Sequence, residues 1–303
     1  MPISPKIKVS AEGLELSKFI QGYWRLDQWS MSSTECLSFL KQHLELGVTT
    51  VDHAHVYGSP PCEQLFGNVL KLEPSIRDKI EIISKCGINL DVDKGANQVP
   101  HYNSDAKNIT QSVETSLKRL QTDYLDVLLL HRPDFLMDSD EISETFTKLK
   151  SEGKIKYFGV SNFSPSQFSL LQSRLDFPLV TNQIEINPIN LEPIQNGTLD
   201  HLQQHRVKPM AWSCLSGGRI FSENSNQMER VRNCLKDIAD EVGASSIEQV
   251  IYAWVMMLPS KPMILIGSGK IQRVKKALNS QDIFLTREQW YRVWVASTGC
   301  NVP

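Results

Sequence analysis

The sequence lacks the features that would embed the chain in a membrane or direct it to a nucleic acid. Its densest apolar run, Tyr252–Leu258, is far shorter than the ~20 residues that span a bilayer. Met1–Val9 has no apolar core of a signal peptide. The 32 basic and 34 acidic residues give a formal charge of −2 without a long run of one sign, which supports neither a nucleic acid nor a membrane surface as a partner. We therefore expect a cytoplasmic protein with a small-molecule ligand.

Paired cysteine motifs and flexible linkers are missing as well. The six cysteines include no C-x-x-C pair, which predicts reduced or buried thiols rather than a disulfide framework. No segment rich in proline, glycine or serine divides the 303 residues, and 41% of them are hydrophobic, which is enough for one large core. We predict a single domain over residues 1–303, and the sequence leaves its oligomeric state open.

What the sequence does contain is a regular alternation of short β-rich runs with amphipathic segments. Several of the runs are almost continuously apolar, as in Val127–Leu130, which is typical of parallel strands covered on both faces. Eight such alternations favour a closed (β/α)8 TIM barrel, a single α/β domain, over an open doubly wound sheet. The eight predicted strands are Phe19–Trp24, Thr49–Ala54, Ile80–Lys85, Tyr124–Arg132, Lys156–Asn162, Leu179–Asn187, Lys208–Cys214 and Met263–Ser268.

Two helices have recognisable ends. Ser32-x-x-Glu35 predicts a capping box before the apolar face of Leu37–Leu44, and Gly47 ends that helix. Ser245-x-x-Glu248 predicts a second box before the apolar face of Ile247–Leu258.

Long loops indicate where a ligand would bind. Gly87–Ser104 and Leu215–Gln227 both follow predicted strands, and in a barrel such loops surround the mouth at the C-terminal ends of the strands. The tail Thr286–Pro303 contains one more predicted helix, Arg287–Ala296. We expect the two loops and the tail to form walls of a substrate pocket.

Four side chains with acid-base chemistry follow consecutive predicted strands. Asp52 ends the second strand, Tyr57 lies five residues further on, Lys85 ends the third strand and His131 ends the fourth. A lysine ammonium close to a phenol favours the phenolate, so Lys85 is expected to lower the pKa of Tyr57 from its reference value of about 10. Asp52 would orient the lysine, and a neutral His131 could donate a hydrogen bond to a substrate carbonyl. Together they would supply a proton to a developing alkoxide.

Each of these residues also has a structural interpretation. Asp52 and Lys85 could be solvated charges at strand ends, Tyr57 could pack beside Gly58, and His131 could satisfy a buried carbonyl. A metal is the other chemical alternative, because His53-x-His55 resembles the H-x-H of barrel hydrolases. The later strands end in Asn162, Asn187 and Ser268, which leaves the ligand set incomplete, so we predict no metal.

Six segments resemble the aldo-keto reductase family in order along the chain: "VDHAHVYG", "ISKCG", "LDVLLLHRPD", "GKIKYFGVSNFSPSQ", "NQIEINP" and "MAWSCLSGGRIF". The resemblance implies a (β/α)8 fold and reversible hydride transfer from NADPH to an aldehyde or ketone. It also assigns the four catalytic roles to Asp52, Tyr57, Lys85 and His131. Some relatives are cofactor-binding regulatory subunits of ion channels, which stays an alternative to an enzyme.

The expected cofactor site lies after the last strand. No G-x-G-x-x-G occurs near the N-terminus, but Gly267, Ser268 and Gly269 lead into a short helix with Lys270 and Arg273. Free amides at a helix start bind anions, and barrels often bind phosphate after strands seven and eight. The resemblance places the adenosine 2′-phosphate here, which favours NADPH. Many members have lysine where Gly267 stands, which would weaken that preference.

The resemblance assigns the remaining cofactor and pocket residues. It implies that Ser161, Asn162 and Gln183 contact the nicotinamide carboxamide and that Trp212 stacks on the ring. The other expected cofactor contacts are Gly22, Ser213, Leu215 and Gly217. The pocket around the substrate, a small aldehyde or ketone, is expected to include Tyr23, Trp24 and His53.

Overall fold

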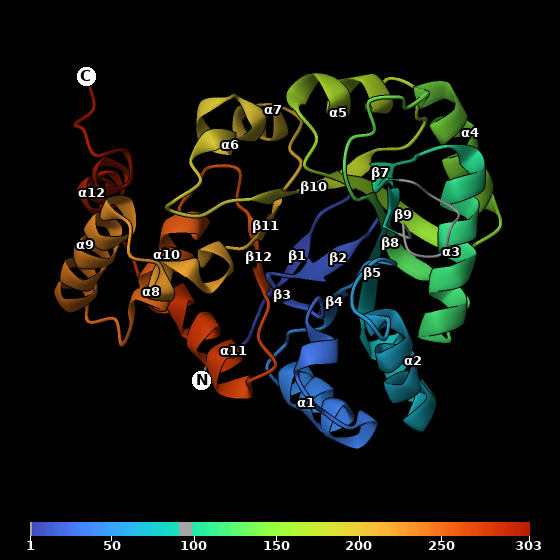
Figure 1. Ribbon diagram of the computed structural model, residues 1–303, viewed down its shortest axis with the longest axis horizontal. Helices are drawn as coiled ribbons and strands as arrows, with labels where there is room; N and C mark the ends of the chain where they lie inside the picture. Colours follow the sequence, from blue (N-terminus) through green and yellow to red (C-terminus); the bar gives the residue numbers. More distant parts are fainter. Residues whose placement is uncertain (1, 91–98) are drawn as a thin grey trace.

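The computed structural model describes residues 2–90 and 99–303, and its centre is a closed barrel of parallel strands. The strands pair around the barrel in the order β10-β11-β12-β3-β4-β5-β8-β9, as Figure 1 shows. This arrangement confirms the predicted (β/α)8 barrel. The barrel strands are β3 (Phe19–Gly22), β4 (Thr50–Asp52), β5 (Glu81–Cys86), β8 (Leu125–Leu130), β9 (Ile155–Ser161), β10 (Leu179–Glu185), β11 (Met210–Trp212) and β12 (Met263–Ile266).

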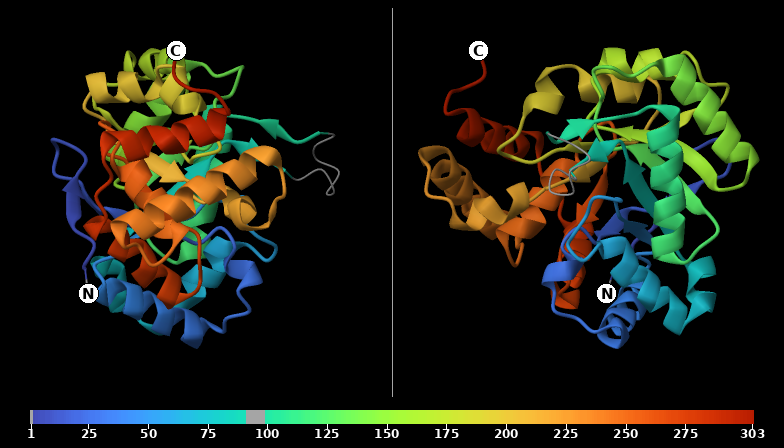
Figure 2. Two further views of the ribbon diagram at one scale, coloured as in Figure 1. Left: turned by 90° about the vertical axis from the view of Figure 1, so that its left-hand side faces the viewer. Right: turned by 45° about the vertical axis from the view of Figure 1, so that its right-hand side comes forward.

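Helices surround the barrel and cover its outer face (Figures 1 and 2). The apolar runs of the strands are therefore buried on both sides, inside the barrel and against the helices. The helices are α1 (Ser33–Glu45), α2 (Cys62–Leu72), α3 (Ala106–Leu120), α4 (Ser139–Ser151), α5 (Pro165–Gln172), α6 (Glu192–Gln195), α7 (Thr198–Gln204), α8 (Arg219–Ser222), α9 (Asn226–Val242), α10 (Ile247–Met256), α11 (Ile271–Leu278) and α12 (Arg287–Thr298). Short 3-10 turns occur at Leu26–Gln28, Pro74–Lys79, Ser216–Gly218 and Asn279–Asp282.

An N-terminal hairpin closes one end of the barrel. Strands β1 (Lys6–Lys8) and β2 (Glu15–Ser17) pair antiparallel, and Leu14 and Leu16 pack onto the apolar interior formed by side chains such as Ile83 and Val127. The hairpin lies at the end where the strands begin, so the open mouth is at their C-terminal ends. A second small hairpin, β6 (Ile88–Asn89) with β7 (His101–Tyr102), follows β5 on the side of the mouth.

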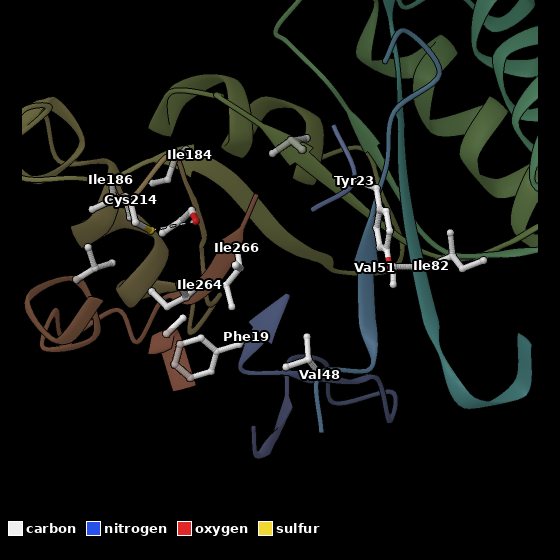
Figure 3. Packing of buried hydrophobic residues seen from close by; sticks show 14 of the residues in the cluster. Phe19, Tyr23, Val48, Val51, Ile82, Ile184, Ile186, Cys214, Ile264 and Ile266 are labelled. Atoms are coloured by element: carbon white, nitrogen blue, oxygen red, sulfur yellow. Dashed lines mark hydrogen bonds between the residues drawn. The ribbon is translucent and has the colours of Figure 1, made fainter. Parts of the chain in front are cut away.

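The larger core lies between the strands and the helices. Figure 3 shows part of it, with Phe19 and Ile264 from neighbouring strands on one side and Tyr23, Val51 and Ile82 on the other. These side chains are fully buried, and each contributes about 1.5–3 kcal/mol relative to an exposed position. This layer fixes the directions of the strands and therefore the positions of the residues at their ends.

The first predicted capping box is confirmed and the second is wrong. Helix α1 begins after Ser32, whose side chain accepts from the Glu35 amide while the Glu35 carboxylate accepts from the Ser32 amide. Helix α10 begins one residue later than predicted, after Ser246, so that Gln249 takes the third helical position and bonds back to Ser245. Glu248 makes no capping contact and lies at the mouth of the barrel.

Helix α12 confirms the helix predicted in the tail, but it lies on the outside of the barrel. It packs chiefly against α9, and Trp290 stacks on Trp254 of α10 at 4.9 Å between ring centroids. No helix in the described part of the chain is long and apolar enough to cross a membrane. All six cysteines are free thiols, and four of them are buried.

Candidate active site

Four strand-end residues meet at the C-terminal mouth of the barrel. Asp52 is the last residue of β4, Lys85 lies one residue before the end of β5, and His131 directly follows β8. Tyr57 extends from the loop after β4, which Arg119 of α3 holds through a 2.7 Å hydrogen bond to the His55 carbonyl. Neighbouring strands of the barrel thus bring together residues that are far apart in the sequence.

Lys85 is the centre of this group. Its ammonium lies 2.7 Å from Asp52 Oδ1, 2.7 Å from the backbone oxygen of His53 and 3.2 Å from the Tyr57 hydroxyl. The three contacts match the three protons of the ammonium. Lys85 is 1% exposed and Asp52 3%, so the structure contradicts the view of these two residues as solvated charges. The second Asp52 oxygen accepts from Gln183 Nε2 at 2.7 Å.

The environment keeps the Lys85 ammonium charged and the Tyr57 hydroxyl protonated. Burial works to lower the pKa of Lys85, but Asp52 and Tyr57 together raise it above its ordinary value. Burial raises the pKa of Tyr57, and the attraction of Lys85 offsets only part of that rise. The expected net lowering of the Tyr57 pKa is therefore wrong, because removing the phenol from water outweighs the nearby charge. At neutral pH the hydroxyl carries a proton that it can donate.

His131 is neutral at physiological pH. Burial and then the charge of Lys85 hold its pKa well below the ordinary value of 6.5. Its Nε2 lies 3.5 Å from the Tyr57 hydroxyl, and the ring packs edge-on against Tyr57 at 5.5 Å between centroids. Nδ1 is buried without a partner among the described residues. A neutral imidazole with Nε2 at the mouth can orient a polar group beside the phenol.

A cavity of about 660 Å³ opens beside Tyr57 and His131, within the size range of cofactor and substrate sites. Most of the predicted cofactor residues line it: Gly22, Ser161, Asn162, Gln183, Trp212, Ser213, Leu215, Gly217, Gly267, Ser268 and Arg273. Two others do not. A Cβ on Gly269 would lie 2.5 Å from the Trp29 ring, so this glycine is explained by packing, and Lys270 is exposed at the start of α11.

A polar network holds one wall of the cavity. The indole N–H of Trp212 donates to Asn162 Oδ1 at 3.2 Å, and Asn162 Nδ2 donates to Ser161 Oγ at 2.8 Å. Asn162 and Ser213 have φ of 60° and 50°, a left-handed conformation that is uncommon outside glycine and recurs at functional sites. Asn162 does not cap α5, since Ser164 does that. The network sets the face that the Trp212 indole presents to the cavity.

Two of the three predicted substrate-pocket residues are misplaced. Trp24 lies at the rim, 53% exposed and 6.2 Å from Tyr57 between ring centroids. Tyr23 and His53 are both 0% exposed, stack on each other at 5.1 Å and contact the layer between strands and helices. Burial and the charge of Lys85 lower the pKa of His53 to about 3, so it is a neutral core residue.

The predicted walls are only partly present. The loop after β11 contributes Leu215, Gly217, Gly218 and Phe221 to the cavity. None of the described residues of Gly87–Ser104 lines it, and residues 91–98 of that loop lie outside the described residues. The tail also contributes no lining residue, because α12 is packed on α9.

The metal hypothesis has no geometry to support it. His53 is buried in the core, while His55 turns both ring nitrogens to backbone oxygens, those of Lys85 at 2.8 Å and Ile88 at 2.9 Å. Within residues 2–90 and 99–303, no three side chains of histidine, cysteine, aspartate or glutamate gather as a metal site would require.

Several lining residues lie outside the predicted site and walls: Arg25, Arg132, Cys214, Glu248, Tyr252, Leu265, Ile266 and Lys276. Lys276 forms a 3.6 Å ion pair with Glu248 at the end of the cavity near α11. The spacing of Lys276, three residues after Arg273, indicates a shared helix face and could have identified it. Glu248 and Tyr252 are likewise four residues apart on α10.

A closed parallel barrel with a buried lysine–aspartate pair against a tyrosine hydroxyl defines the class of carbonyl-reducing barrel enzymes that the sequence resembles. Residues 18–295 match the model of the aldo/keto reductase family, and the chain belongs to that family.

Three known proteins illustrate the relationship. The chain is similar to the oxidoreductase YdhF of Escherichia coli (strain K12), with 51% identity over 98% of this chain and 99% of the relative. It is 37% identical to a 6-dehydroglucose reductase of Agrobacterium fabrum, over 96% of this chain and 98% of the relative. The crystal structure of the thermostable aldo-keto reductase Tm1743 with the inhibitor epalrestat has a TM-score of 0.80, covers 96% of this chain and 99% of its own, and shares the fold at 24% identity. The protein is thus an oxidoreductase of a family that acts on carbonyl compounds and generally uses a nicotinamide cofactor.

Proposed function

We propose that the protein reduces an aldehyde or ketone to the alcohol with NADPH as hydride donor and Tyr57 as proton donor. The observation that carries the proposal is the 3.2 Å contact between the Lys85 ammonium and the Tyr57 hydroxyl at the edge of the cavity. A charged amine that is fixed against a phenol stabilises the phenolate left after proton transfer.

Each of the four side chains has one task in this mechanism. Tyr57 donates its proton to the carbonyl oxygen as negative charge develops there. Lys85 stabilises the phenolate, and Asp52 holds Lys85 in place at 2.7 Å. Neutral His131 donates a hydrogen bond to the same carbonyl oxygen, which orients the carbonyl and stabilises the growing charge. In the reverse direction the phenolate accepts the proton of the alcohol.

The cavity fits a nicotinamide dinucleotide, which when bound supplies or accepts the hydride. Gly217 and Gly267 have open space where a Cβ would lie, and a Cβ on Gly22 would make only ordinary contacts with the end of β12. These glycines leave room for a flat, extended ligand. Trp212 would stack on the nicotinamide, and Ser161, Asn162 and Gln183 would hold its carboxamide.

The end of the cavity near α11 supports NADPH over NADH. Arg273, Lys276 and Ser268 line it together with Glu248, the 3.6 Å partner of Lys276. Two cations therefore face one carboxylate, which leaves a net positive charge and a hydroxyl near free amides at a helix start. Lys276 offers a second cation where Gly267 replaces the lysine of many relatives. The 2′-phosphate would therefore be held by α11 rather than by residue 267.

Replacing Arg273 or Lys276 by alanine is expected to raise the KM for NADPH by about tenfold, because each loses a hydrogen bond to a charged phosphate. The KM for NADH should change by less than about twofold. Steady-state kinetics with both cofactors measure this difference, and Lys275→Ala is the matched control on the same helix. An equal loss with NADH would contradict a 2′-phosphate contact.

Consumption of NADPH with a panel of aldehydes, ketones and sugars, followed at 340 nm, tests the function itself. We expect turnover on the order of 1–1,000 per second with good substrates, the usual range for enzymes. Oxidation of bound NADPH that stays negligible with every carbonyl would overturn the reductase and favour a cofactor-binding regulatory subunit.

A further inference from the structure

Arg132 is a cation in the cavity that forms no ion pair or hydrogen bond with another side chain that the structure describes. It follows His131, is partly buried and lines the cavity. Its guanidinium reaches from the end of β8 to a position 5.7 Å from the centroid of the Trp212 ring. In the described part of the chain its side chain has no carboxylate within 4.0 Å and donates no hydrogen bond. Its five N–H groups are therefore available to a ligand.

The other charges of the cavity leave Arg132 unneutralised. Two carboxylates line the cavity among residues 2–90 and 99–303, and both are paired, Asp52 with Lys85 and Glu248 with Lys276. The proposed cofactor phosphate accounts for Arg273 near α11. Strand β8 lies four places from β12 in the ring of eight strands, so Arg132 enters the cavity from the opposite side. It adjoins His131, whose Nε2 lies 3.5 Å from the Tyr57 hydroxyl, and its charge is one of the smaller effects that lower the pKa of Tyr57 against the larger effect of burial.

A second arginine, which has no ion pair among the described residues, extends this positive region to the rim. Arg25 lines the cavity, and its guanidinium lies 4.9 Å from the centroid of the Trp24 ring, which is itself exposed at the mouth. A cavity lined by cations at its entrance attracts anions and raises their local concentration. The cofactor alone does not explain cations on this side of the site.

We propose that the substrate carries an anionic group, a carboxylate or a phosphate ester, and that Arg132 binds it while the carbonyl lies at Tyr57 and His131. The inference rests on the proposed reductase function. Arginine presents parallel N–H donors to two oxygens of a carboxylate or phosphate, and such charge-assisted pairs are stronger in a partly buried site than at the surface. Arg132 would thereby favour negatively charged substrates, while Tyr57 and His131 act on the carbonyl.

Two matched pairs of substrates test the proposal: 4-carboxybenzaldehyde against benzaldehyde, and D-glyceraldehyde 3-phosphate against D-glyceraldehyde. In the wild-type enzyme, we expect kcat/KM to favour the anionic member of at least one pair by about tenfold or more. A preference in the first pair identifies a carboxylate and one in the second identifies a phosphate ester. In Arg132→Gln that ratio should fall at least about tenfold, mainly through KM, and Arg132→Lys should restore part of it.

The Arg25→Gln variant separates a direct contact from a general field. It removes the same charge from the rim, so its effect on the ratio should stay below about twofold if Arg132 makes the contact. Equal effects of the two variants would overturn the proposal. The proposal would also be overturned if Arg132→Gln raised the KM for NADPH as much as the KM for the anionic substrate, since Arg132 would then bind the cofactor. If the wild type reduces neutral aldehydes but shows no anionic preference, this inference fails alone; if no aldehyde is reduced, the proposed function fails with it.

Discussion

Replacing Tyr57 by phenylalanine is expected to lower kcat for aldehyde reduction by about 100-fold to 10,000-fold, the usual contribution of a positioned acid. The variant should remain folded, because Lys85 keeps its contacts with Asp52 and the His53 backbone oxygen. The dissociation constant for NADPH, measured by fluorescence titration, should change by less than about twofold. The fall in kcat would then reflect the missing proton donor rather than a change in cofactor binding.

The matched control is Tyr157→Phe, which removes a hydroxyl that donates to the Glu12 carbonyl at the hairpin of the closed end. It should leave kcat unchanged. Since burial raises the Tyr57 pKa above its ordinary value of 10.0 and the His131 pKa lies well below 6.5, the wild-type rate of reduction should be flat from about pH 6.5 to 10 and fall only above that. A rate that declines through pH 7–9, or full activity in Tyr57→Phe, would rule out this phenol as the acid.

The barrel could be predicted from the sequence because the alternation of a β-rich run with an amphipathic segment occurs eight times. All eight predicted strands overlap a strand of the closed sheet. The errors lie at the ends, as in Lys208–Cys214 against the observed Met210–Trp212. The residues that flank a strand at either end have the composition of a strand, but they have no backbone partner on a neighbouring strand and so lie outside the sheet. An apolar composition indicates that a residue is buried, and residues can be buried beyond the last one that is hydrogen-bonded to the next strand.

The same end effect explains the misplaced pocket residues. Gly22 and Asp52 pair in register at the mouth, and the next residue of each strand, Tyr23 or His53, turns to the other face. Successive side chains of a strand alternate between faces, so a strict application of this rule would have placed both residues against the helices. The left-handed backbone at Asn162 and Ser213 was not predicted, although asparagine adopts this conformation more often than most residues.

The gathering of Asp52, Tyr57, Lys85 and His131 was predictable because strand ends converge in a barrel, whereas the direction in which the pKa of Tyr57 shifts was not. The sequence places a lysine near the phenol, but only the structure shows how completely the pair is removed from water. Because this cluster is buried, we expect Lys85, Asp52 and Tyr57 to contribute to stability as well as to the proposed catalysis. Lys85 is 1% exposed, so its buried charge is stable only while the Asp52 carboxylate lies beside it.

Replacing Lys85 by methionine should therefore destabilise the protein and inactivate it together. The change leaves the Asp52 carboxylate buried, with Gln183 as its one remaining side-chain hydrogen-bond donor among the described residues. Removing one partner of a buried pair costs about 3–5 kcal/mol. Urea unfolding measures the loss of stability. The surface variant Lys150→Met, which removes an exposed pair with Glu12, is the control and should cost less than about 1 kcal/mol.

The double variant Lys85→Met with Asp52→Asn separates stability from catalysis. An asparagine can still accept from Gln183 without a buried charge, so much of the lost free energy of unfolding should return. The activity should not return, because no cation is left to stabilise the Tyr57 phenolate. If the double variant regained activity along with stability, the ion pair would be a structural support alone. If Lys85→Met alone remained as stable as the wild type, the pair would be less isolated from water than its geometry indicates.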